Sequence, residues 1–360
     1  MAQTEQPAKL THWMIYGAYG YTGELIAREA VKRGLSPILG GRDKYKTQEL
    51  ADELGLRAVA FDLDNPERTA SHLSDVSLVL NCAGPFSSTA RVMMPACINA
   101  GTHYLDITGE ISVFEFAQSL KESALNANVV LCPGVGFDVI PTDCVAATLS
   151  SALPDATHLA LGFDSRSAFS PGTAKTSVEG LAQGGKIRRD GDIITVPLAY
   201  KVRQIDFGDN EKLAMTIPWG DVSTAYHTTG IPNIEVYIPS SEKMVKNVKR
   251  ANLIRPLLGS QWVQSLLKSH IGKKIKGPDE AQRGETKTYV WGEATNAEGM
   301  KKTVHILTTN GYDLTVTGSL AIAAHLLKSH SAAGVYTPSK LMGADFVTQL
   351  PGCSTFQFEK

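Results

Sequence analysis

Residues 13–42 read WMIYGAYGYTGELIAREAVKRGLSPILGGR, and this stretch decides the fold. The short apolar run 13–16 predicts a strand, and residues 24–33 repeat apolar side chains at helical spacing until Gly34. Residues 37–39 predict a second strand. Strand, helix and strand in this order predict a βαβ unit with two parallel strands.

The loop between the first strand and the helix has the sequence GAYGYTG at 17–23. Its first glycine allows a tight turn, its second lets the backbone approach a pyrophosphate, and its third lets the helix pack close to the sheet. The N-terminus of the helix adds free N–H groups and a positive dipole end. We therefore predict that this loop binds a dinucleotide, through Gly17, Tyr19, Gly20, Tyr21, Thr22 and Gly23. The alternative is a purely structural glycine turn.

The second strand ends in Gly40-Gly41-Arg42, where an NAD-binding site usually has Asp or Glu. A carboxylate would hydrogen-bond the ribose 2′-hydroxyl and repel a 2′-phosphate, whereas arginine binds that phosphate by charge-assisted hydrogen bonds. Arg42 therefore predicts NADP(H) as the cofactor, with Lys44 and Lys46 adding positive charge nearby. The alternative is that Arg42 only stacks on the adenine ring.

Strand and helix patterns continue to alternate as far as residue 132. The run 76–82 is almost wholly apolar, which is typical of a strand buried on both faces. Right-handed crossovers then predict an α/β fold, with a Rossmann doubly wound parallel sheet in residues 1–140. Its further strands are expected at 58–61, 76–82, 103–107 and 129–132, and its further helices at 44–54, 92–100 and 113–126.

In such a sheet the cofactor lies across the carboxyl ends of the strands. The fourth strand ends in NCAGPF at 81–86, where a small Ala-Gly turn lets the nicotinamide ribose approach the backbone and Pro85 fixes the turn. Asp62-Leu63 follows the third strand and is predicted to border the adenine, although a helix-capping loop accounts for it almost as well. The further cofactor residues are therefore Asp62, Leu63, Cys82, Ala83, Gly84, Pro85 and Phe86.

The pattern changes after Pro133. Residues 141–316 predict an inserted α+β domain with a mostly antiparallel sheet, and residues 317–360 predict a helix and a tail that pack back on the first domain. The expected strands are 193–196, 204–207, 234–238, 287–294 and 303–308. The expected turns are Asp190-Gly191, Gly208-Asp209-Asn210 and Asn310-Gly311.

Two acid-rich motifs follow the fifth and sixth strands: YLDITGE at 104–110 and PGVGFDVIPTD at 133–143. Their carboxylates are candidates for binding a substrate, relaying protons or capping helices. For each carboxylate alone, capping or a buried hydrogen bond is the simpler interpretation. The four acids are Asp106, Glu110, Asp138 and Asp143.

Composition excludes several classes of protein. A formal net charge of −1 argues against a nucleic-acid partner, and 43% hydrophobic residues suit a globular chain with a real core. Five scattered cysteines without a C-x-x-C pair predict reduced thiols and a cytoplasmic location. Residues 1–11 lack the apolar core of a signal peptide, and no metal site is expected.

Residues 243–276 contain no Asp or Glu but carry nine lysines and arginines among leucines, isoleucines and Trp262. A basic amphipathic pattern of this kind can lie peripherally on an anionic membrane surface. It can equally bind an acyl carrier or a CoA phosphate. The simplest interpretation is an ordinary pair of surface helices whose apolar faces belong to the core.

With these motifs the chain resembles the saccharopine dehydrogenase-like oxidoreductase family, which includes the trans-acting enoyl reductases of mycobacterial lipid synthesis. Later segments contribute to the resemblance, among them SPGTAKTS at 170–177, NGYDLT at 310–315 and GVYTPSKLMGADF at 334–346. The resemblance implies an NADP-binding Rossmann domain, a second α+β domain and hydride transfer. A homodimer is expected only by analogy.

These inferences predict an NADPH-dependent reductase that transfers hydride to a polarised C=C, C=O or C=N bond of a small molecule, with an acyl or lipid substrate favoured by the family. The candidate proton donors are Tyr226, His227, Lys175 and Asp138. Tyr226-His227 is expected in a loop-like stretch. Two alternatives stay open: a saccharopine-type amino-acid dehydrogenase, and a non-catalytic NADP-binding sensor or scaffold at lipid surfaces.

Overall fold

A computed structural model describes residues 12–165, 183–258, 286–329 and 331–359. The chain divides into two compact units. Of the described residues, the first unit takes those within 1–107, 116–133 and 319–336, and the second takes those within 108–115, 134–318 and 337–360.

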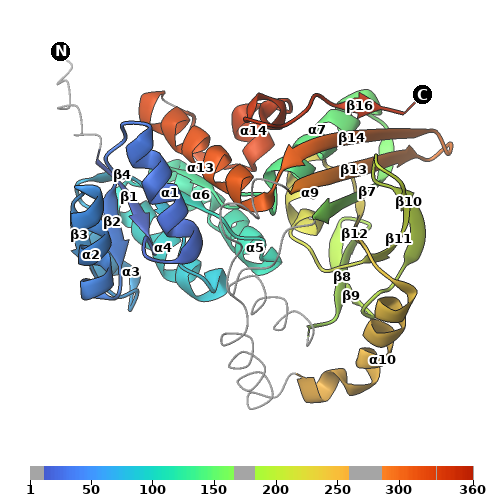
Figure 1. Cartoon of the computed structure of the whole chain (residues 1–360), viewed down its shortest axis with the longest axis horizontal. Helices are drawn as coiled ribbons and strands as arrows, with labels where there is room; N and C mark the ends of the chain where they lie inside the picture. Colours follow the sequence, from blue (N-terminus) through green and yellow to red (C-terminus); the bar gives the residue numbers. More distant parts are fainter. Residues whose placement is uncertain (1–11, 166–182, 259–285, 330, 360) are drawn as a thin grey trace. The chain divides into compact units, whose positions relative to one another are not determined.

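The first unit is built on a seven-stranded parallel sheet in the order β15-β6-β5-β4-β1-β2-β3. Figure 1 labels four neighbouring strands of this sheet, β4, β1, β2 and β3. After β3 the chain crosses back to the other side of β1 to form β4, so the strand order reverses between β1 and β4. Dinucleotides bind at this kind of switch point. The strands are β1 His12–Tyr16, β2 Ile38–Gly41, β3 Ala58–Ala60, β4 Val76–Asn81, β5 His103–Asp106, β6 Val130–Cys132 and β15 Gly334–Val335.

Five helices of the first unit alternate with these strands, and short-range hydrogen bonds fix where they begin. The Asp43 carboxylate caps one helix by accepting from the amides of Tyr45 and Lys46, and Asn65 caps the next by accepting from the Arg68 amide at 2.8 Å. The helices are α1 Tyr21–Lys32, α2 Lys44–Leu54, α3 Pro66–Ser71, α4 Phe86–Ala100 and α6 Lys121–Asn126. A further helix, α5 Ile111–Ser119, begins in the second unit and continues in the first.

The predicted doubly wound parallel sheet is confirmed, and its six expected strands are all present. Two helices differ from expectation. The helix expected at 113–126 is interrupted at Leu120 and forms α5 and α6, and the helix expected at 92–100 begins earlier, at Phe86. Its first turn is polar and carries no apolar periodicity, so the sequence pattern detects only the later part.

The second unit contains a nine-stranded sheet in the order β10-β11-β12-β7-β13-β14-β16, with β8 and β9 attached at β12. All its pairings are antiparallel except that of β12 with β7. The strands are β7 Ala156–Ser165, β8 Gly185–Arg189, β9 Asp192–Val196, β10 Val202–Asp206, β11 Glu211–Thr216, β12 Asn233–Pro239, β13 Lys287–Asn296, β14 Lys301–Thr309 and β16 Gln357–Phe358.

The helices of the second unit correct two expectations. Tyr226-His227 lies in a helix, α9, and not in a loop. Asn310-Gly311 is not a turn but the start of helix α13, where the Asn310 side chain accepts from the amides of Tyr312 and Asp313 at 3.0 Å. The helices are α7 Ile140–Ala152, α9 Asp221–Thr229, α10 Glu242–Leu258 and α14 Pro338–Met342, with a short 3-10 turn at Phe346–Gln349. A further helix, α13 Gly311–Lys328, begins in the second unit and continues in the first from Ser319.

The C-terminal tail is shared between the two sheets. β15 pairs with β6 in the parallel sheet of the first unit, and β16 pairs with β14 in the sheet of the second unit. The tail therefore does not act as one segment that packs on one domain. None of the helices in the described part of the chain is long and apolar enough to cross a membrane.

Candidate functional site

The glycine loop, residues 17–23, has a backbone arrangement that side chains would not permit. Gly17 has φ of +79°, and a Cβ atom on it would lie 2.8 Å from the Ala83 amide nitrogen. A Cβ atom on Gly23 would collide with the Gly17 carbonyl oxygen. The loop thus presses against the turn after β4, and no side chain caps α1 at Gly20. An uncapped helix start beside bare backbone fits the pyrophosphate of a dinucleotide.

Charge at the end of β2 is arranged as a 2′-phosphate requires. Arg42 is exposed, while the acid beside it, Asp43, uses its carboxylate to cap α2. The Tyr19 ring lies against Gly41, where a Cβ atom would lie 2.5 Å from Cε1, and the Tyr19 hydroxyl accepts from the Asp43 amide at 3.3 Å. Lys46 Nζ is 5.9 Å from the centroid of the same ring. A cation remains at the place where NAD-specific sites have a carboxylate.

Asp62 and Leu63 follow β3, next to the ends of β1 and β2. Burial raises the pKa of Tyr16 at the end of β1, and the charges of Asp62 and Arg42 both act on its hydroxyl. The Tyr16 hydroxyl donates to the Phe61 carbonyl at 2.9 Å. Asp62 is exposed, and the capping of α3 belongs to Asn65. Capping therefore does not explain Asp62, and its place beside Arg42 suits a residue that borders the adenosine.

The turn at 82–86, after β4, is fixed by a buried hydrogen-bond network. Asn81 Oδ1 accepts from the Ala83 amide at 3.0 Å, and the Thr89 hydroxyl donates to the Ala83 carbonyl at 2.6 Å. Asn81 Nδ2 donates to the Tyr104 hydroxyl, which in turn donates to Asp106 Oδ2 at 2.7 Å. Asp106 is thus engaged in a buried hydrogen bond, the simpler of its two interpretations. The network holds the expected nicotinamide side of the cleft, through Cys82, Ala83, Gly84, Pro85 and Phe86.

The network was missed by sequence reasoning, although Asn81, Tyr104 and Asp106 are all printed in the motifs quoted above. Their spacing along the chain carries no sign of contact. Only the parallel register of β4 with β5, which places Asn81 opposite Asp106, brings these side chains together.

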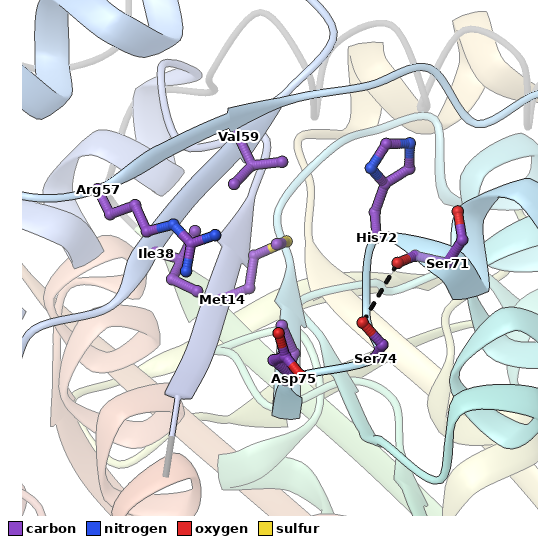
Figure 2. A pocket seen from close by; sticks show the side chains of 9 residues that line it. Met14, Ile38, Arg57, Val59, Ser71, His72, Ser74 and Asp75 are labelled. Carbon is purple, nitrogen blue, oxygen red and sulfur yellow. Dashed lines mark hydrogen bonds between the residues drawn. The ribbon is translucent and has the colours of Figure 1, made fainter. Parts of the chain in front are cut away.

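A separate cavity of about 190 Å³ opens at the other edge of the parallel sheet (Figure 2). Ile38 and Val76 are the first residues of β2 and β4, so the cavity lies at the amino ends of the strands. Arg57, His72 and Asp75 border it, and His72 stacks on Phe61 at 4.5 Å. Cofactors bind at the carboxyl ends of such strands, so this cavity is not the dinucleotide site.

In the second unit, three loops meet around Asp138. A Cβ atom on Gly109 would lie 2.8 Å from Asp138 Oδ2, and one on Gly220 would lie 3.0 Å from the Gly109 carbonyl oxygen. Trp219 Nε1 donates to the Asp138 carbonyl at 2.9 Å. The YLDITGE motif, the PGVGFDVIPTD motif and the segment before α9 are therefore in contact at one place.

The Asp138 carboxyl is the group at this junction that is best suited to exchange a proton. The residue is partly buried, and burial raises its pKa to about 7. A carboxyl with that pKa exchanges a proton at neutral pH, which ordinary aspartates, ionised above about pH 4, do not. Aromatic rings lie close by. The ring centroids of Trp219 and Phe163 are 4.9 Å apart, and those of Phe163 and Phe137, the residue before Asp138, are 5.6 Å apart. The arrangement suits proton transfer in a partly dry environment.

Tyr226 and His227 are instead part of an ion-pair network. The buried Arg188 guanidinium lies 4.1 Å from the Tyr226 ring centroid and donates to the Val222 carbonyl at 2.6 Å and to Glu115 at 3.2 Å. His227 Nε2 lies 3.4 Å from the same Glu115 carboxylate. These contacts favour a structural role for the Tyr226-His227 pair. Lys175, the remaining catalytic candidate, lies outside the described residues.

The fold and the glycine loop define a Rossmann-type dinucleotide-binding protein with a second α+β unit. The model of the Saccharopine dehydrogenase NADP binding domain matches residues 13–132, which makes NADP(H) the cofactor of this domain. Over this domain the chain is similar to the saccharopine dehydrogenase-like oxidoreductases.

Three related proteins each match only part of the chain. The human saccharopine dehydrogenase-like oxidoreductase is 27% identical over 40% of this chain and 37% of its own length. A probable mitochondrial saccharopine dehydrogenase-like oxidoreductase of Arabidopsis thaliana is 27% identical over 52% of this chain and 47% of its own. A trans-acting enoyl reductase of Mycobacterium ulcerans is 30% identical over 36% of this chain and 33% of its own length. The chain thus matches less than half the length of each of these relatives.

One solved structure shares the fold over almost the whole chain. Apo saccharopine dehydrogenase (L-Glu forming) from Saccharomyces cerevisiae superposes with a TM-score of 0.62, at 12% identity, over 98% of this chain and 100% of the other. At that identity the similarity concerns the fold alone. It supports the combination of a parallel sheet with a second mixed sheet, which the sequence predicted.

Replacing Arg42 by Gln should raise the Kd for NADPH about tenfold or more, since a hydrogen bond to a charged group contributes about 1.5–3 kcal/mol. The Kd for NADH should change little because NADH has no 2′-phosphate. Fluorescence titration of both cofactors measures this. Arg33→Gln, which removes an exposed arginine paired with Glu29 at 2.8 Å, is the matched control. Equal weakening of both cofactors by Arg42→Gln would contradict the assignment.

A second prediction concerns acid stability. The His227 imidazole beside it, with help from the Ser223 hydroxyl and the Arg188 charge, lowers the pKa of Glu115 to about 2 from 4.5. Because the folded pKa is the lower one, Glu115 stabilises the fold above about pH 4.5 and loses this effect as pH falls towards 2. Glu115→Gln should therefore lower the free energy of unfolding at pH 7 by about 1 kcal/mol.

Urea unfolding at several pH values measures this difference, which should shrink below about pH 4.5. Glu122→Gln, at an exposed position of α6, is the control. A wild-type advantage that stays constant down to pH 3 would show that the Glu115 network does not stabilise the fold.

Proposed function

We propose that this protein is an NADPH-dependent reductase that adds hydride to a polarised C=C, C=O or C=N bond, with Asp138 as the proton donor. The observation that carries the proposal is the Asp138 junction: a partly buried carboxyl with a pKa of about 7, which belongs to the PGVGFDVIPTD motif and lies against Gly109 of the YLDITGE motif. In the chain, Asp138 follows the end of β6 by six residues, and β6 belongs to the sheet that binds the cofactor.

The residues of the first unit would bind the cofactor and orient it. When bound, NADPH supplies the hydride. The glycine loop would hold the pyrophosphate, Arg42 the 2′-phosphate, and the buried Asn81 network would keep the turn 82–86 in one conformation. A preformed site costs no reorganisation when the reaction begins, which is the protein's main contribution to cofactor chemistry.

Asp138 would supply the proton. A reduced double bond gains a hydride at one atom and a proton at the other, so the donor must be protonated at the working pH. Burial keeps a large fraction of Asp138 protonated near pH 7. Trp219 donates to the Asp138 carbonyl, and Gly109 lies against the carboxyl itself, so both limit the freedom of this side chain to turn away.

An amino-acid substrate is the less favoured alternative. A saccharopine-type reaction needs cations that bind several carboxylates, but three arginines of the second unit already have partners. Arg188 pairs with Glu115, Arg189 donates to the Tyr200 hydroxyl at 2.9 Å, and Arg203 makes two bonds to Glu293 at 3.0 and 3.2 Å. An uncharged acyl or lipid substrate requires no such cations, and the enoyl reductase relatives are consistent with it.

We also propose that the protein works in the cytoplasm with peripheral contact to an anionic lipid surface through α10. Lys243, Lys246, Lys249 and Arg250 are exposed on this helix, and Glu242 is paired with Lys246 at 3.5 Å. Leu253 is 85% exposed and Met244 is 51% exposed. Cations beside exposed apolar side chains suit the interface of an anionic bilayer. The remainder of the basic stretch, beyond residue 258, lies outside the described residues.

Asp138→Asn should lower kcat for NADPH oxidation roughly 100-fold or more, the usual effect of losing a general acid. The Kd for NADPH should stay the same. In the wild type, kcat should fall as pH rises through about 7, because the protonated form of the donor is then lost. The assay uses enoyl, keto and imine substrates in parallel.

The control for this variant is Asp75→Asn, which changes an aspartate at the cavity on the opposite edge of the parallel sheet. Tight NADPH binding without turnover on any substrate class would favour the non-catalytic sensor or scaffold instead. Full activity in Asp138→Asn would remove Asp138 from the mechanism but not the reductase itself.

Vesicle flotation tests the membrane proposal. Replacing both Lys246 and Arg250 by Gln should reduce binding to vesicles with an anionic lipid roughly 30-fold, at about 1 kcal/mol for each cation near the surface. Lys301→Gln with Lys302→Gln, two exposed cations of β14, should leave binding unchanged. Binding that is equal for neutral and anionic vesicles, or unaffected by the α10 substitutions, would refute the proposal.

A further inference from the structure

Behind Asp138 lies a second carboxyl, Asp221, whose surroundings are unusual for an acid. It is the first residue of α9 and is 0% exposed. Among the described residues, neither of its oxygens has a hydrogen-bond partner of normal geometry. An ionised carboxylate left in this way would be strongly unfavourable, because burial removes its water and nothing replaces it.

A neighbouring acid, Asp143, shows the contrast. Asp143 is equally buried, but its oxygens accept from the Ser339 amide at 2.8 Å and from the Thr228 hydroxyl. Burial raises the pKa of Asp143 as well, but these donors oppose that effect, whereas the Asp221 oxygens have no hydrogen bond of normal geometry. When two buried acids interact, the one with donors ionises first and the other keeps its proton.

Thr142 supplies the decisive detail. Its hydroxyl lies beside the Asp221 carboxyl and would lower the pKa of that acid by donating to it. However, a threonine has one hydroxyl proton, and this one is donated to the Val139 carbonyl at 3.1 Å. The oxygen of Thr142 therefore offers lone pairs to Asp221, which only a protonated carboxyl can use.

We propose that Asp221 is a neutral carboxylic acid that positions Asp138 through Thr142. Its O–H would donate to the Thr142 oxygen, and the Thr142 hydroxyl donates to the carbonyl of Val139, the residue next to Asp138. If Asp221 ionised, the Thr142 hydroxyl would turn to it and release the Val139 carbonyl. The protonation of one acid is in this way coupled to the backbone that holds the other.

The charged groups around Asp221 agree with this assignment. The carboxyls of Asp143 and Asp138 act on Asp221, and both disfavour a further negative charge, as does burial, the largest influence raising its pKa. The nearby cation, Arg188 of β8, is directed to the Val222 carbonyl and to Glu115. The inference rests on the proposed function only for the role of Asp138, and its test needs no turnover.

Infrared spectroscopy of the full-length protein tests the proposal, because a protonated carboxyl and a carboxylate absorb at different frequencies. At pH 8, well above the pKa of ordinary aspartates and about one unit above that of Asp138, the wild type should retain a band from a buried carboxylic acid. The band should be lost in Asp221→Asn and retained in Asp138→Asn. Absence of the band in the wild type, or its survival in Asp221→Asn, would overturn the proposal.

The titration of Asp138 gives a second, independent measurement. A band that titrates near pH 7 and disappears in Asp138→Asn reports this group. In Asp221→Asn its midpoint should not move, since Asn replaces one neutral group by another. A midpoint that falls by about one unit or more would mean that a negative charge had been removed, and that Asp221 is ionised in the wild type.

Thr142→Val and Thr142→Ser form the matched pair for the positioning role. Serine keeps the hydroxyl and should leave the Asp138 midpoint unchanged, whereas valine removes it with little change in volume and should move the midpoint. The result does not depend on finding a substrate, so an inactive protein with these spectra would refute the reductase but not this inference. Equal midpoints in both variants would refute the positioning role of Thr142.

Discussion

The close approach of bare backbone at the end of β1 is the constraint on which the first unit depends. Gly17 lies so close to Ala83 that a Cβ atom would overlap its amide nitrogen, and Gly23 leaves no room for one beside the Gly17 carbonyl. This contact joins the glycine loop after β1 to the turn after β4. The strand order of the sheet reverses between these two strands. The start of α1 and the turn 82–86 then face the same cleft.

Much of the first unit was predictable because its signals are local. Buried parallel strands are continuous apolar runs, and glycines mark the loops between them, so six strands and the cofactor loop follow from the printed sequence. The second unit was less predictable because its strands depend on partners distant in the chain. β11, with the sequence EKLAMT, consists largely of helix-forming residues and becomes a strand by pairing with β10 and β12.

The candidate site divides in the same way. The residues that bind the cofactor stand together in short motifs, and a motif can be found by spacing. The residues around Asp138 come from three separate segments that together span more than 100 positions, at Gly109, Asp138 and Gly220, and no pattern along the chain indicates that they touch. The same limit applied to Tyr226-His227, where the polar composition resembles a loop and the contacts with Arg188 and Glu115 belong to a packed helix.

Four aspartates in this protein show that the partner, and not the residue type, decides the role. Asp106 accepts from a buried tyrosine, Asp143 accepts from an amide and a hydroxyl, Asp138 is partly exposed with its backbone held, and Asp221 is sealed without a donor. The donors to Asp143 oppose the effect of burial, which raises its pKa, whereas burial without donors favours the protonated forms of Asp138 and Asp221. A protein that needs one group to exchange a proton at neutral pH gains from keeping its neighbour neutral, because a second charge nearby would raise the pKa of the exchanging group beyond the range in which it can act.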